Sequence, residues 1–230
     1  MAAKGGNHLD LATFDFNDAE RRGQYFVEWR VTNPEVASNL SRLQATLKEI
    51  EPTVEILQSC AADNIHITMN ELTLNSEDQV RQCLAVVQEF ERTDFHEIVS
   101  ATAAPINTVV GGLDDFDKRV LFTRVNAEGG NDILTRLFNA LHKRLVAAGF
   151  APKAGRPFQP HITVCKAPRG SKVIPAKVFE EVRARGLDTA SLGQQPLDQL
   201  AFCVKRKKAE PTPPVLYTIS AAATEGVAAA

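Results

Sequence analysis

The sequence has few of the residues that cross-link a chain or hold a structural metal. Its 230 residues include only four cysteines, Cys60, Cys83, Cys165 and Cys203. They form neither a CxxC motif nor a cluster with histidine at zinc-binding spacing. The HExxH motif of zinc proteases is absent as well. We therefore expect free thiols in a reducing compartment and neither a metal nor another cofactor.

Long apolar runs are also missing. No stretch of about 18 apolar residues occurs, so neither a transmembrane helix nor a membrane partner is expected. The first 22 residues are polar and carry acids, unlike a secretory signal. These features predict a cytoplasmic protein. The basic run Lys205–Lys208 leaves three interpretations open: a nuclear address, a contact with RNA phosphates, or a solvated strand end.

Net charge is almost absent, because the two halves of the chain carry opposite charges. The formal charge is −2, yet residues 1–142 hold 12 basic and 22 acidic side chains, and residues 143–208 hold 14 basic and 4 acidic ones. An excess of +10 in the second half favours an anionic partner on that side. Since the first half is acidic, we expect a short oligonucleotide or a nucleotide and not a DNA duplex.

Periodicity predicts an α+β fold in which strands and helices alternate. Each half of the chain runs strand, helix, strand, with a histidine-bearing strand near its middle, which suggests a decayed internal duplication. We expect two antiparallel-rich sheets facing each other with helices outside. We expect a leader at 1–20, one domain at 21–222 that is monomeric, and a frayed tail at 223–230. Helices are predicted after the N-caps Asn33 and Ser76 and at 131–148 and 175–185, with a turn or bulge at Gly111-Gly112. Strands are predicted at 24–31, 65–74, 95–102, 106–110, 119–125, 160–166, 196–204 and 215–221.

Two of the five histidines begin the same tripeptide, His66-Ile67-Thr68 and His161-Ile162-Thr163. From composition alone, the probability that two of five histidines begin such a tripeptide by chance is on the order of 1%. Residues i and i+2 of a strand point to the same side, so each motif puts an imidazole beside a hydroxyl and its isoleucine in the opposite layer. Taken singly, such a tripeptide is usually a half-buried histidine beside a surface threonine. The matched pair instead indicates one shared site.

Two imidazoles and two hydroxyls suit the cleavage of a phosphodiester without a metal. One neutral histidine can take a proton from the attacking hydroxyl while the other, protonated, gives one to the leaving oxygen. The threonine hydroxyls can donate to the non-bridging phosphate oxygens as charge builds there. We therefore predict His66, Thr68, His161 and Thr163 as the catalytic set.

At these residues the sequence resembles the 2H phosphoesterase superfamily, named for its two histidines. Arg156–Thr163 looks like the second motif of that family, and the likeness runs from about Gln24 to Ser220. It is most similar to the central domain of A-kinase anchoring proteins of the seven/eighteen type, through Tyr25-Phe26-Val27, Asn33, Lys205–Lys208 and Tyr217. One departure is Gln159, where the anchoring domains tend to carry a basic residue. No helix that would bind a kinase regulatory subunit is evident.

The resemblance implies a bilobal fold with a nucleotide site between the lobes and metal-independent action on 2',5'-linked or cyclic phosphodiesters. Related proteins act on 2',5'-oligoadenylate, and the anchoring domain binds AMP. Arg156, Phe158 and Tyr25 are added as candidate substrate-binding residues. Arg156 could contact a phosphate or order its loop, and Phe158, like Phe26, could stack on a base or pack in the core. Lys166 is expected at the surface.

The function predicted from the sequence is a metal-independent 2',5'-phosphodiesterase acting on 2',5'-linked oligoadenylate or similar short RNA. Attack by the neighbouring 3'-hydroxyl would give a 2',3'-cyclic phosphate, and attack by water a monophosphate; the sequence does not choose. Two alternatives stay open: a 2',3'-cyclic phosphodiesterase or RNA-end-processing enzyme, and a module that binds AMP or RNA without turnover.

Overall fold

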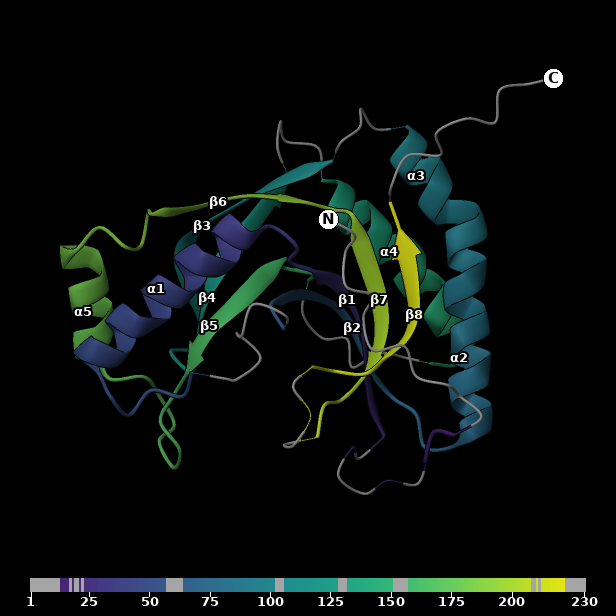
Figure 1. Cartoon of the computed structure of the whole chain (residues 1–230), viewed down its shortest axis with the longest axis horizontal. Coiled ribbons are helices and arrows are strands. Elements are labelled where there is room, and N and C mark those ends of the chain that lie inside the picture. The colour runs from purple at the N-terminus through teal and green to yellow at the C-terminus, as the bar shows by residue number, and fades with distance from the viewer. Residues whose placement is uncertain are drawn as a thin grey trace.

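The computed structural model describes residues 13–16, 18, 21, 23–56, 64–101, 106–127, 132–150, 157–207, 210 and 212–221. Within these residues, eight strands form two antiparallel sheets of four (Figure 1). The first sheet has the order β2 (His66–Thr73), β1 (Gln24–Arg30), β7 (Gln199–Val204) and β8 (Val215–Ser220). The second has the order β5 (His161–Lys166), β4 (Val120–Ala127), β3 (Asn107–Phe116) and β6 (Ser191–Pro196). The predicted α+β architecture of two antiparallel sheets is confirmed.

Helices α1 and α2 begin at the N-caps that the sequence predicts. Asn33 accepts a hydrogen bond from the backbone N–H of Glu35 at 2.8 Å and caps α1 (Pro34–Ile50). Ser76 accepts one from Gln79 N–H at 3.2 Å and caps α2 (Glu77–Phe90). The remaining helices are α3 (His96–Ser100), α4 (Ile133–Ala147) and α5 (Ala176–Ala184). In the described part of the chain, none of the helices is long and apolar enough to cross a membrane.

Each sheet is covered by a helix that comes from the other sheet's connections. Helix α1 joins β1 to β2 of the first sheet but packs against β5, β6 and α5 of the second. Helix α4 joins β4 to β5 of the second sheet but packs against β2 and α2 beside the first. Figure 1 shows α1 and α5 over one sheet and α2 and α4 over the other. This exchange couples the two halves of the chain, because each sheet would lose the helix that packs on it if the two sheets separated.

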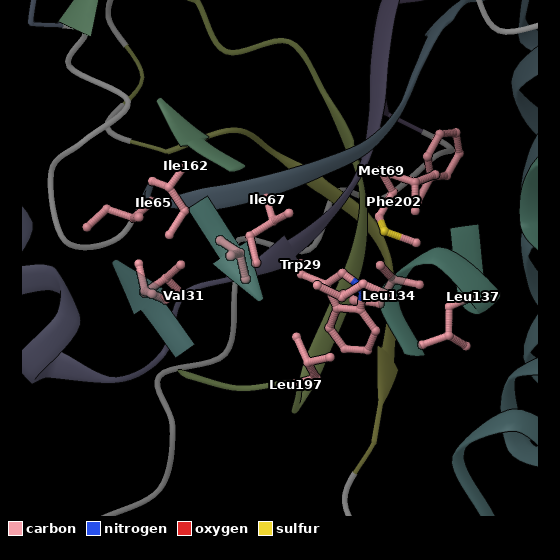
Figure 2. Packing of buried hydrophobic residues seen from close by; sticks show 14 of the residues in the cluster. Trp29, Val31, Ile65, Ile67, Met69, Leu134, Leu137, Ile162, Leu197 and Phe202 are labelled. Carbon is pink, nitrogen blue, oxygen red and sulfur yellow. The ribbon is translucent and has the colours of Figure 1, made fainter. Parts of the chain in front are cut away.

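One buried cluster takes residues from both sheets and from the helices that cover them. Trp29 of β1 is fully buried and lies near the ring of Phe95, with centroids 6.1 Å apart. The isoleucines that follow the two motif histidines, Ile67 and Ile162, belong to the same cluster and are 0% and 2% exposed (Figure 2). The predicted alternation of both motif strands is therefore confirmed, since burial of these isoleucines turns the histidines to the other side.

The predicted strand at 95–102 is wrong over its described residues, and residue 102 lies outside them. The segment Glu91–Phe95 forms a π-helical turn (η2), and α3 follows it, so the chain stays helical from α2 onward. Phe95 is fully buried with its ring 5.9 Å from that of Phe90, and Arg144 of α4 pairs with Asp94. These contacts outweigh the local preference of the β-branched residues in this segment.

The predicted strand at 196–204 is in fact the end of one strand and the whole of the next. Strand β6 ends at Pro196 in the second sheet, and β7 begins at Gln199 in the first. The sequence did not reveal β6 because Gly193 and two glutamines carry a weak strand signal. Gly111-Gly112 is a bulge in β3, where Gly112 has φ +71° and the pairing with β4 shifts.

The described part of the predicted leader contacts the domain. Phe14 and Phe16 pack against the buried cluster, and Asp18 pairs with Lys207. Arg21 donates to the carbonyl of Lys205 at 2.8 Å and pairs with Glu210. Residues 1–12 of the predicted leader and 223–230 of the predicted tail lie outside the described residues.

Candidate active site

The two His-x-Thr motifs lie on the two strands along which the sheets meet. His66 begins β2 and His161 begins β5, and each of these strands is an end strand of its sheet. Strands β2 and β5 contact each other. The two rings are close enough to interact, because the charge of His66 is one of the causes that lower the pKa of His161. The structure thus brings together two motifs that are 95 residues apart in the sequence.

The two motif strands make the same pairing with their neighbours. His66 lies opposite Arg30 and Thr68 opposite Glu28 in the first sheet; the register then shifts, which leaves Met69 as an extra residue. In the second sheet His161 lies opposite Arg124 and Thr163 opposite Phe122, and the same shift leaves Val164 as the extra residue. A bulge directly after the threonine of each motif supports the duplication inferred from sequence.

Each imidazole is held by the same backbone contact. His66 Nδ1 is 2.8 Å from the carbonyl oxygen of Asn64, and His161 Nδ1 is 2.8 Å from that of Gln159. A carbonyl oxygen can only accept a hydrogen bond, so Nδ1 carries the hydrogen in both rings. In a neutral ring, Nε2 is then the nitrogen that can take up a proton. Both histidines are therefore prepared for proton transfer at the same atom.

The surroundings of the two Nε2 atoms differ. The Nε2 atom of His66 lies 3.5 Å from Oε2 of Glu28, a carboxylate that is 1% exposed. His161 instead has the rings of Phe116 and Phe122 near it, with centroids 4.9 and 5.1 Å away. Burial lowers the pKa of His161, and the charges of His66 and Lys166 lower it further, against the effect of the Gln159 carbonyl. The site is symmetric in its backbone and asymmetric in its electrostatics.

Arg124 is a further candidate that the sequence alone did not single out. It lies opposite His161 in β4, and paired residues of an antiparallel sheet share a face. Its Nη2 donates to Asp114 Oδ2 of β3 at 2.8 Å, and its side chain is 50% exposed. A guanidinium held in place beside His161 can bind a phosphate. Arg124 is identified as a neighbour of His161 only through the pairing of β4 with β5, and that pairing cannot be derived from a single sequence.

The structure describes two of the three candidate substrate-binding residues, and both have rings packed against other side chains. Tyr25 is 2% exposed, its ring lies 6.0 Å from that of Phe202, and burial raises its pKa to about 12. The ring of Phe158 stacks on that of Phe138 of α4, with centroids 4.3 Å apart. Arg156 lies outside the described residues. Their part in substrate binding stays a prediction.

The basic residues weighed from the sequence take the following positions. Lys166 is exposed at the end of β5, where its backbone pairs with Glu55. Lys207 and Arg206 bond to Glu210, Lys207 through its backbone N–H and Arg206 to the Glu210 carbonyl. Lys208 lies outside the described residues. Within the part that the structure describes, no three His, Cys, Asp or Glu side chains are grouped to hold a metal ion, and metal independence stays a prediction.

The fold and this pair of motifs define the class of protein. Two antiparallel four-stranded sheets that meet along two His-x-Thr strands are the arrangement of a 2H phosphoesterase. The model of the AKAP7 2'5' RNA ligase-like domain family matches residues 24–219, so the chain belongs to this family. Family and fold together support a phosphodiesterase of the 2H phosphoesterase type. A search of the curated proteins found no match to the sequence.

Solved structures are similar to this chain over most of its length. TT0787 of Thermus thermophilus has a TM-score of 0.59 at 20% identity, covering 86% of this chain and 97% of that one. LigT of E. coli in its apo form has a TM-score of 0.53 at 15% identity, covering 86% and 96%. LigT has also been solved with 3'-AMP, at a TM-score of 0.54, 16% identity and coverage of 86% and 97%. At these identities the likeness shows the fold.

Proposed function

We propose that this protein is a metal-independent phosphodiesterase that cleaves 2',5'-linked oligoadenylate or similar short RNA with His66 and His161 as its acid–base pair. The observation that carries the proposal is the matched geometry of the two rings, each with Nδ1 2.8 Å from the carbonyl of the residue two positions earlier. A module that only binds a nucleotide has no need for two imidazoles prepared in the same way at Nε2.

The reaction starts with the 3'-hydroxyl beside the 2'-linked phosphate. One histidine takes the proton of this hydroxyl as its oxygen bonds to phosphorus. The bond from phosphorus to the 5'-oxygen of the next nucleotide breaks, and the other histidine gives that oxygen a proton. The products are a 2',3'-cyclic phosphate and a free 5'-hydroxyl. Attack by water in place of the 3'-hydroxyl gives a monophosphate instead.

The threonine hydroxyl near each imidazole and the cation near His161 can bind the phosphate. Thr68 and Thr163 lie two residues after their histidines and share the partly exposed side of each strand. Their hydroxyls can donate to the non-bridging oxygens, which gain negative charge in the transition state. Arg124 adds a cation on the side of His161 and extends the positive character of the second half of the chain.

The proposed preference for a 2',5' linkage rests on family and chemistry together. The chain belongs to a family described as 2'5' RNA ligase-like, and E. coli LigT has been solved with 3'-AMP. A ribonucleotide with a 2',5' linkage keeps its 3'-hydroxyl next to the phosphorus, where a histidine can activate it. A 3',5' linkage presents the 2'-hydroxyl on the other side of the phosphate, so a site shaped for one linkage can discriminate against the other.

The test is cleavage of trimeric 2',5'-adenylate and of its 3',5' isomer, each with EDTA present. We expect loss of the 2',5' isomer alone, with the rate reduced about 10²–10⁴-fold in H66A and in H161A. His96 is exposed on α3 and belongs to neither motif strand, and H96A is the matched control that should keep the rate. Saturable AMP binding without cleavage of either trimer would instead establish a binding module, and a requirement for a metal would rule out the mechanism.

A further inference from the structure

A buried carboxylate lies beside the first histidine, and the equivalent position in the register of the second is occupied by an aromatic residue. Glu28 of β1 pairs with Thr68 on one side and with Ala201 of β7 on the other, and it is 1% exposed. Its Oε2 atom is 3.5 Å from His66 Nε2. Phe122 takes the equivalent place opposite Thr163. The duplicated strands thus offer a carboxylate to one imidazole and an aromatic ring to the other.

Glu28 also faces a cation of its own strand. Arg30 Nε lies 3.2 Å from Glu28 Oε1, and Arg30 Nη2 donates to Cys203 Sγ at 3.1 Å. Burial lowers the pKa of Arg30, but Glu28 and Cys203 outweigh it and the pKa is raised. Burial, followed by the charge of Glu28, raises the pKa of the Cys203 thiol. Arg30 is thus a lasting cation and Cys203 is neutral, and the Glu28 carboxylate lies between Arg30 and His66.

On the side of the second sheet, the neighbouring charges lower the pKa of the histidine. His161 and Lys166 of β5 face the pair from there, Arg124 of β4 lies opposite His161 with its guanidinium bound to Asp114, and the rings of Phe116 and Phe122 lie beside that of His161. Within the described residues no carboxylate lies at ion-pair distance from His161, whereas His66 Nε2 lies at that distance from Glu28.

We propose that Glu28 is a positioning residue that keeps a proton on Nε2 of His66, which makes His66 the proton donor and His161 the proton acceptor of the reaction. The division of roles rests on the proposed function; the placement of the proton does not. In the reaction, His161 Nε2 takes the proton of the attacking hydroxyl and His66 Nε2 releases its proton to the leaving oxygen. The proton returns from His161 to solvent and from solvent to His66 between turnovers.

The direct test follows the ring protons of both histidines by NMR as the pH is changed, without any substrate. H66A and H161A assign the two signals. In the wild type, His66 should hold its proton to a higher pH than His161. In E28Q the midpoint of the His66 signal should fall by about one pH unit, because an opposite charge within hydrogen-bond range is removed. Glu71, exposed on the same strand as His66, provides the control E71Q, which should leave both signals unchanged.

A second variant covers the case in which E28Q does not fold. E28Q leaves Arg30 buried without its counter-charge, which destabilises a protein more than removing both charges. E28Q/R30M takes away the whole pair and keeps the length of the side chains. It should show the same fall in the His66 midpoint. An unchanged midpoint in a folded variant, or a wild type in which His161 holds its proton to the higher pH, overturns the proposal.

The pH profile of cleavage connects the proton to the reaction. A proton donor that loses its proton more easily limits the rate at high pH, so E28Q should lose about tenfold near pH 8 and little near pH 6. A uniform loss at every pH would mean that Glu28 has only a structural role. Absence of cleavage by the wild type would count against the proposed function alone, since the NMR titration still decides where the proton lies.

Discussion

Gln44 of α1 donates its side-chain Nε2 hydrogen to the carbonyl oxygen of Val164 in β5 at 3.0 Å. Val164 is the extra residue of the bulge that follows His161-Ile162-Thr163, and Gln44 is buried. A helix from the connections of the first sheet thus satisfies the backbone of the strand that carries the second histidine. The bulge and the helix exchange act together to fix the place of His161.

Replacing Gln44 by leucine should therefore affect both stability and activity. A carbonyl left buried without a donor costs about 1–3 kcal/mol of the free energy of unfolding. Because the bulge is next to the motif, the rate of cleavage should fall as well. Urea denaturation and the cleavage assay measure the two effects. Thr46, partly exposed one half-turn further along α1, gives the control T46A, and equal behaviour of Q44L and T46A would contradict this account.

The isoleucines between histidine and threonine should prove to be the structural members of the motifs. Ile67→Ala and Ile162→Ala each remove a buried side chain and should cost about 2–5 kcal/mol, whereas Ile162→Val should cost about 0.5–1.5 kcal/mol. Denaturation midpoints at constant slope provide the measurement. Val173→Ala, at a side chain that is 46% exposed, should stay within about 0.5 kcal/mol. A comparable loss in V173A would mean that burial is not the cause.

Stability should depend on pH through His161. The pKa of this ring is lowered by folding, so as the pH falls below about 6.5 the unfolded chain binds a proton before the folded one does. The contribution is complete above that pH and declines below it. The fall in Tm from about pH 7.5 to about pH 5 should then be smaller in H161Q than in the wild type. An equal or larger fall in H161Q would assign the acid sensitivity to other groups.

Arg124 should contribute to binding more than to chemistry. We expect R124M to raise KM for the 2',5' trimer about tenfold with a smaller change in kcat, because a charged hydrogen bond to phosphate is lost. Added salt should weaken binding less in R124M than in the wild type. Arg81, which pairs with Glu77 on the exposed side of α2, gives the control R81M. If R124M and R81M have the same KM, Arg124 has no part in the site.

The sequence predicted the features that local rules determine. The caps at Asn33 and Ser76, the burial of Ile67 and Ile162, and the matched motif strands all follow from turn chemistry and alternation. The sequence-based prediction failed where tertiary contacts determine the secondary structure. Phe95 is helical because of what it packs against, and β6 exists because its backbone pairs with β3.

The same limit applies to the candidate site. The two histidines could be recognised from the sequence, since each carries its own motif. Glu28 and Arg124 could not, because their relation to the histidines exists only in the cross-strand register. Tyr25 was chosen from its place in a family-like stretch, and the structure places it in the buried cluster.

The central claim is that His66 and His161 act as one acid–base unit on a single phosphate. The most direct measurement is the rate of cleavage of the 2',5' trimer by wild type, H66A, H161A and the double variant, all with EDTA present. Groups that act as a unit are not additive, so the double variant should be about as slow as either single variant. A wild-type rate in either single variant, or losses that multiply in the double variant, would contradict the account.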